Sequence, residues 1–140
     1  YEGDGIWHHL VGTVSATSDT NELWIDGVKK ESVTGVGTLN ETINDASLCQ
    51  NGADSAYFDG DMKDVAIYGR QLTDDEIAVI YNSRGVSGDK GIDLVSGSHV
   101  SNTGLIAHFR FEEKSGTVAI NEAGVNGTYV NAPAITTNIP

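Results

Sequence analysis

The chain has 140 residues, enough for one domain, or one domain and part of another, with a modest core. Twenty acidic against eight basic residues give a formal net charge of −12, and no basic cluster occurs. Binding to nucleic acid and to anionic membranes is therefore disfavoured, because both need clustered Lys and Arg. No apolar run approaches the roughly 20 residues of a membrane-spanning helix, so membrane insertion is not expected.

The first third of the chain predicts a set of antiparallel strands. Residues 6–16 form a strand, the polar segment 18–21 closes a hairpin, and residues 22–27 form its partner. Asp26-Gly27 is itself a turn signal, so residues 28–31 are expected to return as another short strand. The 17 glycines agree with such a turn-rich protein.

The aromatic residues of this region give two expectations. Trp7 is expected to pack in the core. If Leu23 and Ile25 face inward, Trp24 lies on the other face of the sheet, because successive strand residues alternate. Trp24 is therefore a candidate for stacking on a sugar ring, and the alternative is that a loop or a partner chain covers it.

The middle of the chain holds the clearest local signals. Ile77, Ile80 and Tyr81 recur at helical spacing after Thr73-Asp-Asp-Glu76, which is a capping box. Cys49 is the only cysteine, which excludes an intramolecular disulfide, and a buried structural thiol is expected. The remaining predicted elements are a loop at 34–46, strands near 46–50 and 57–68, a helix at about 73–82, a Gly/Ser-rich connector at 84–103, and strands near 105–112 and 127–130.

Five motifs carry a resemblance to a known family. WHHLVGT (7–13), LWIDG (23–27) and FDGDMKDVAIYGRQLTDDEIAVIY (58–81) resemble the C-terminal half of a laminin-G-like, concanavalin-A-like jelly-roll domain. GLIAHFRFEEKSGT (104–117) and NEAGVNGT (121–128) resemble the opening strand and following loop of the same family. The chain is thus similar to the end of one such domain followed by the start of another.

This resemblance implies an all-β fold, a concanavalin-A-like jelly-roll sandwich of antiparallel strands with one short helix, incomplete or rearranged relative to the family. The expected division is 1–84 as the C-terminal half, 85–103 as a connector, and 104–140 as N-terminal strands packed with 1–84 as one unit. Residues 105–130 are then expected beside residues 58–68. A fragment of a tandem array and a shortened, rearranged domain both remain open. An incomplete sandwich leaves edges and apolar faces uncovered, so a homo-oligomer is expected, most simply a dimer with paired or exchanged strands.

The resemblance also implies a metal site. A calcium ion often lies where the first and last strands of the family meet, and the matching ligands here are Asp64, Glu112 and the Gly127 carbonyl. Calcium prefers such carboxylate and carbonyl oxygens. His8 and His9 are not expected to bind a metal, because neighbouring strand residues point to opposite faces. One of them is expected to face the interior and the other the solvent.

Three functions follow from the resemblance. The first is a non-catalytic module that binds carbohydrate or a glycosylated surface. The second is a structural or adhesive repeat of a larger surface or virion protein with no glycan site. The third and weakest is a fragment of a glucanase-like enzyme, which the absence of the Glu-x-Asp-x-x-Glu pattern disfavours, so no catalytic residue is assigned. The family implies an extracellular, cell-surface or virion location, and no signal peptide is visible in the chain.

Overall fold

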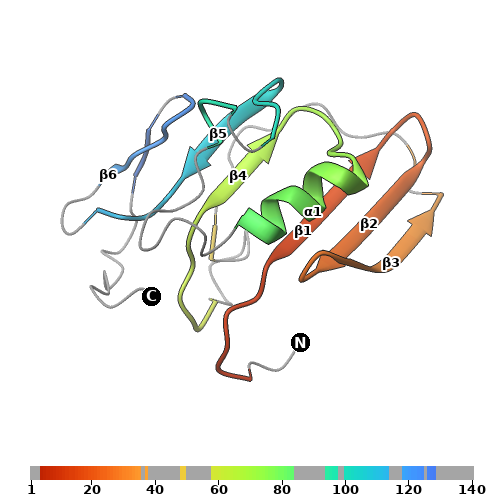
Figure 1. Ribbon diagram of the computed structural model, residues 1–140, viewed down its shortest axis with the longest axis horizontal. Helices are drawn as coiled ribbons and strands as arrows, with labels where there is room; N and C mark the ends of the chain where they lie inside the picture. Colours follow the sequence, from red (N-terminus) through yellow and green to blue (C-terminus); the bar gives the residue numbers. More distant parts are fainter. Residues whose placement is uncertain are drawn as a thin grey trace.

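A computed structural model describes residues 4–35, 37, 48–49, 58–83, 94–97, 100–113, 118–124 and 126–128. These residues form antiparallel strands and one short helix, as expected from the sequence (Figure 1). The elements are β1 Leu10–Ser15, β2 Thr20–Ile25, β3 Val28–Thr34, β4 Val65–Tyr68, α1 Asp74–Ser83, β5 Leu105–Phe109, β6 Val118–Ala119 and β7 Gly127–Thr128.

The first three strands form one sheet in the order β1-β2-β3. The turn between β2 and β3 is Asp26-Gly27, and both residues have positive φ, 52° and 73°. This is the backbone of the two-residue hairpin turn whose twist matches that of the flanking strands. The turn predicted from the Asp-Gly pair is confirmed, and β3 extends to Thr34, beyond the expected end of that strand.

The two regions that resemble opposite ends of the family domain meet in the second sheet. β4 pairs antiparallel with β5, with Val65 opposite Phe109. Residues 105–109 of the later segment therefore lie beside residues 65–68, while the packing of residues 110–130 against this segment and the domain boundaries stay predictions. β6 and β7 form a further short hairpin at the β5 side (Figure 1).

Helix α1 covers one face of this arrangement and creates the core. In Figure 1 the helix lies in front of β1 and β2. The buried cluster joins one residue of β2 with residues in and just before α1 and with residues of the segment between α1 and β5. It consists of Trp24, Leu72, Ile77, Ile80, Leu94 and Val100. The alternation in β1 and β2 thus directs Val11 and Trp24, which are directly opposite one another, toward the helix.

Two expectations about burial were wrong, and the condition attached to a third is not met. Trp24 is only 6% exposed and Leu23 is 43% exposed, so Trp24, and not Leu23, faces the core. Helix α1 provides the cover, and Trp24 cannot serve as an open sugar platform. Trp7 is 46% exposed because it precedes β1 and lies outside the sheet. Cys49 is exposed, in a bend with φ of 65°, a conformation that a strand does not allow. Residues 46, 47 and 50 of that expected strand lie outside the described residues.

The start of α1 is held by the predicted capping box and by an arginine. The Glu76 amide donates to Thr73 Oγ1 (3.2 Å), and the Thr73 amide donates to Glu76 Oε2 (2.9 Å). Arg70 then donates two hydrogen bonds to the Glu76 carboxylate, at 2.8 and 2.7 Å. Its Nε also donates to the Thr103 carbonyl (2.6 Å), just before β5. One guanidinium therefore connects the helix to the later part of the chain.

The approach of α1 to the β2–β3 turn predicts the effect of a Gly27 substitution. A Cβ atom at Gly27 would lie 2.8 Å from Cδ1 of Tyr81, and φ is positive there. We expect Gly27→Ala to destabilise the fold by about 2–3 kcal/mol, because strain and a steric clash combine. Gly35→Ala is the matched control, since φ is +78° and nothing lies within 4 Å of the added atom. Equal losses of stability in urea unfolding would contradict the close helix–turn contact.

The Arg70–Glu76 pair predicts a loss of stability in acid. The Arg70 hydrogen bonds lower the pKa of Glu76 from 4.5 to about 2. A carboxylate whose pKa is lower in the folded state stabilises the fold above the unfolded pKa, and this contribution is lost as pH falls from about 4.5 toward 2. Glu76→Gln should therefore cost about 2 kcal/mol at pH 7 and progressively less in this range. Asp75→Asn, at an exposed position of the same helical turn, controls for the helix dipole. A pH-independent difference in unfolding free energy would exclude this role of the pair.

Candidate functional site

The main cluster of buried polar groups is built around His108 on β5. His108 is fully buried, on the same face of the ladder as its partner Ala66. Its Nε2 lies 3.6 Å from Oδ1 of Asp64, which precedes β4, and its Nδ1 lies 3.3 Å from Oε2 of Glu122. These contacts lack hydrogen-bond geometry, and within the part of the chain that the structure describes both ring nitrogens and Asp64 Oδ1 are buried without a hydrogen-bond partner. Burying polar groups in this way is costly, so each of them calls for an explanation, such as a functional role.

The turn after β6 brings Glu122 into this cluster. Asn121 Oδ1 accepts hydrogen bonds from the amides of His108 (2.9 Å) and Ala123 (3.0 Å). The Glu122 amide donates to the His108 carbonyl (3.0 Å), and the Asn121 amide donates to Asn126 Oδ1 (2.9 Å). The asparagines of the NEAGVNGT segment thus fix the backbone of the turn to β5. As a result, the backbone position of Glu122 is set by local hydrogen bonds.

Arg110 extends the cluster from the buried histidine to the surface. Its Nη2 donates to Glu112 Oε1 (2.7 Å), while Nη1 lies 3.6 Å from Glu122 Oε1 and Nε lies 3.9 Å from Asp64 Oδ1. Glu113 Oε1 accepts from the Ile120 amide (2.6 Å). A pocket of about 200 Å³ opens here, and it is lined by Arg110, Glu112, Glu113, Ile120 and Glu122. We call it the Arg110 pocket.

The Arg110 pocket combines donors, acceptors and an apolar side chain in a small space. Arginine donates from a rigid planar group, carboxylates accept from hydroxyl groups, and Ile120 offers an apolar contact. Such a lining suits a polar, hydroxyl-rich ligand. Asp64 connects this pocket to the buried histidine, because its Oδ1 lies 3.9 Å from Arg110 Nε and 3.6 Å from His108 Nε2.

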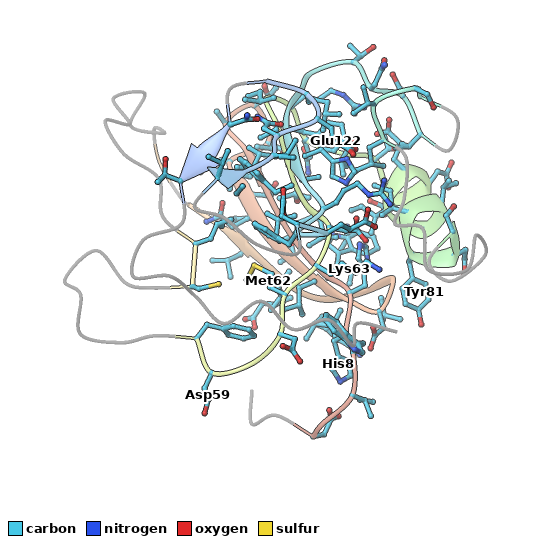
Figure 2. The ribbon with its side chains drawn as sticks, turned by 90° about the vertical axis from the view of Figure 1, so that its left-hand side faces the viewer. His8, Asp59, Met62, Lys63, Tyr81 and Glu122 are labelled. Carbon is cyan, nitrogen blue, oxygen red and sulfur yellow. The ribbon has the colours of Figure 1, made fainter. Side chains whose placement is uncertain are left out.

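A second histidine cluster is separate from the pocket. His8 Nδ1 lies 2.7 Å from Asp26 Oδ2, and its Nε2 lies 3.1 Å from Asp4 Oδ2. Hydrogen bonds with Asp26 and then Asp4 raise the pKa of His8. Figure 2 shows His8 well apart from Glu122. Because Asp26 belongs to the β2–β3 turn, its hydrogen bond with His8 anchors the segment before β1 to that turn. We expected one of the two neighbouring histidines to face the interior and the other to face the solvent. Instead, His8 and His9 are both partly buried.

Comparison with protein families agrees with these elements. The family model for laminin G 3, described as the concanavalin A-like lectin/glucanases superfamily, matches residues 3–78, which include β1 to β4 and the start of α1. The chain belongs to this superfamily. The membership that the motifs of the sequence suggested is therefore confirmed. No curated protein matches the chain.

A solved structure is similar to part of the chain. It is an S-layer domain-containing protein (residues 221–444) from Clostridium thermocellum ATCC 27405, at 24% sequence identity and a TM-score of 0.42. The match covers 58% of this chain and 42% of that chain. The chain thus spans less than half of that structure. In the part of our chain that the structure describes, no helix is long and apolar enough to cross a membrane.

The residues expected to bind calcium come together only in part. Asp64 and Glu112 both approach Arg110, whose guanidinium supplies a positive charge between them. Gly127 pairs with Ala119 in the β6–β7 hairpin, and its Cα faces the ring of Phe109. In the described part of the chain, no group of three or more His, Cys, Asp or Glu side chains is arranged to hold a metal ion. This arrangement fits a guanidinium better than calcium, and the calcium site stays a prediction.

Sequence reasoning missed His108, Arg110 and Glu122. The signal was present in Ala107-His-Phe-Arg-Phe-Glu112, where His108 and Arg110 are two residues apart and so share one strand face. Two polar side chains on one face of an otherwise apolar strand indicate a polar cluster. Glu122 had no comparable signal, because only the Asn121 hydrogen bonds bring it to β5.

The guanidinium gives a direct test of the calcium prediction. Calcium and Arg110 would compete for Asp64 and Glu112, so we expect millimolar calcium to change the Tm of the unmodified chain little. Arg110→Gln should increase the response, since calcium at a hundredfold excess over Kd stabilises a folded protein by about 2.7 kcal/mol.

Lys30→Gln controls for the loss of one positive charge at an exposed position elsewhere. If both the unmodified chain and Arg110→Gln ignore calcium, the site implied by the resemblance is wrong. If the unmodified chain responds strongly and Asp64→Asn does not, calcium displaces the guanidinium.

Proposed function

We propose that this domain is a non-catalytic module that binds carbohydrate or a glycosylated surface, and that the Arg110 pocket is its sugar site. The observation that carries the proposal is the lining of the pocket, which combines one guanidinium, three carboxylates and the apolar side chain of Ile120. Sugar hydroxyls both donate and accept hydrogen bonds, and the pocket offers both complements. Membership in a superfamily that includes lectins supports the same function.

The carboxylates of the pocket support binding rather than hydrolysis. Glycosidases need one carboxyl group as an acid and a second as a base or nucleophile, on opposite sides of the scissile bond. Here Glu112 is paired with Arg110, Glu113 accepts from the Ile120 amide, and Glu122 contacts His108. Each carboxylate therefore has a structural contact. We accordingly assign no catalytic residue, and place the module outside the cell, where glycans are displayed.

A structural or adhesive repeat without a glycan site is the second candidate. The observation that favours it is a row of exposed apolar residues on the sheet face opposite α1, including Leu10 (64% exposed) and Val28 (53% exposed). Apolar patches of this kind mark interaction surfaces. A repeat would use this surface for assembly, whereas a sugar-binding module requires the Arg110 pocket.

Glycan binding by the purified chain separates these candidates. On a glycan array followed by calorimetry, we expect saturable binding to a restricted set of sugars. Glu122→Gln should weaken binding about tenfold, or 1.4 kcal/mol, because an amide replaces a charged acceptor in the pocket.

Glu31→Gln is the control, since it makes the same chemical change at an exposed position on β3. Assays for new reducing ends should show no hydrolysis of the bound sugars. Silence across the array would favour the structural repeat, and binding that Glu122→Gln leaves unchanged would exclude this pocket.

A further inference from the structure

A histidine ahead of β1 contacts two carboxylates at once. His8 Nδ1 lies 2.7 Å from Asp26 Oδ2, and its Nε2 lies 3.2 and 3.1 Å from the two carboxylate oxygens of Asp4. Hydrogen bonds to both carboxylates need a proton on each ring nitrogen, and only the charged imidazolium carries two. The neutral ring donates to one carboxylate and turns a lone pair toward the other. The three side chains therefore fit together fully only when His8 is charged.

We propose that His8 is a pH-dependent switch, which in its charged form ties the segment before β1 to the β2–β3 turn and in its neutral form releases Asp4. The switch is separate from the Arg110 pocket and does not depend on sugar binding. Histidine suits this role, because its charge changes near neutral pH.

The backbone decides which carboxylate the neutral ring keeps. Asp26 Oδ1 accepts a hydrogen bond from the His9 amide (3.0 Å), and the Asp26 amide donates to the His9 carbonyl (2.9 Å). These bonds fix Asp26 beside the imidazole. Asp4 is more exposed, at 47% against 32% for the Asp26 side chain, and its Oδ1 accepts from the Ile6 amide (3.1 Å) of its own segment. The single proton of the neutral ring thus stays on Nδ1, and the lone pair of Nε2 repels the Asp4 carboxylate.

The direction of the switch follows from the two aspartates. Hydrogen bonds with Asp26, and then with Asp4, raise the pKa of His8 above its ordinary value of 6.5. A histidine whose pKa is higher in the folded state stabilises the fold below its unfolded pKa, and this contribution is lost as pH rises through the folded pKa. The segment is therefore held in mild acid and released toward alkaline pH. The Glu76 carboxylate has the opposite dependence, because its contribution is lost in acid.

Neighbouring ionisable side chains take part in other contacts or lie elsewhere. The ring of His9 lies beside that of Tyr81 on α1, with 6.0 Å between the ring centroids. Figure 2 shows Asp59 and Lys63, which belong to the segment before β4, apart from His8. The charge of His8 is thus tied to the two aspartates that it contacts.

An amide in place of one carboxylate tests the switch. In an NMR titration, Asp4→Asn should lower the pKa of His8, whose ring signal is identified by its loss in His8→Gln. Asp4→Asn should also lower the Tm at about pH 6, and this difference should vanish at about pH 9, where the unmodified chain has already released Asp4. Asp19→Asn is the matched control, because Asp19 also accepts a backbone amide through Oδ1 (2.9 Å), but in the β1–β2 turn at the far end of the hairpin. Its effect on Tm should be the same at both pH values.

The release itself is measured at Trp7, which lies between Asp4 and His8 in the chain. Trp24 is buried and Trp7 is 46% exposed, so quenching of tryptophan fluorescence by acrylamide reports mainly on Trp7. We expect the quenching constant of the unmodified chain to rise with pH through the pKa of His8, and that of Asp4→Asn to be high throughout. A quenching constant that is independent of pH in the unmodified chain would overturn the proposal. So would a His8 pKa that Asp4→Asn leaves unchanged.

Discussion

The Arg70 guanidinium is the contact on which the rest of the structure depends, because it joins parts of the chain that are 33 residues apart. It satisfies the Glu76 carboxylate at the start of α1 and also donates to the Thr103 carbonyl ahead of β5. Arginine suits this task, since its planar fork makes several hydrogen bonds in fixed directions. With the entry to β5 fixed against the helix, the β4–β5 register is defined. That register then places His108 between Asp64 and Glu122.

The fold divides its two sheets between different tasks. The first sheet uses one face for the core, where α1 covers Trp24, and leaves the other face apolar and exposed. The second sheet buries His108 beside Asp64 and Glu122, and burying polar groups that lack hydrogen bonds is costly. Such a cluster adds little to stability, which comes instead from the apolar core under α1.

The sequence was sufficient for features that local chemistry decides. The capping box located α1, Asp26-Gly27 located a hairpin turn, and motif order identified the family. It was insufficient where tertiary packing decides. Leu23, Trp24 and Ile25 are all apolar, so alternation alone cannot say which face is buried, and the choice is made by α1 packing on Trp24. The polar cluster was missed for the same reason, because its members come from β5, the approach to β4 and a distant turn. The family resemblance pointed to Asp64 and Glu112 as neighbours, but it did not predict that Arg110 contacts both of them.

Single sugar sites bind weakly, because a shallow pocket must replace well-solvated hydroxyl groups. A surface with repeated glycans is bound more strongly when two such sites are held in one assembly, since the second contact is intramolecular and benefits from a high effective concentration. The proposed binding through the Arg110 pocket would therefore gain from any arrangement that places two copies of the domain on one glycosylated surface.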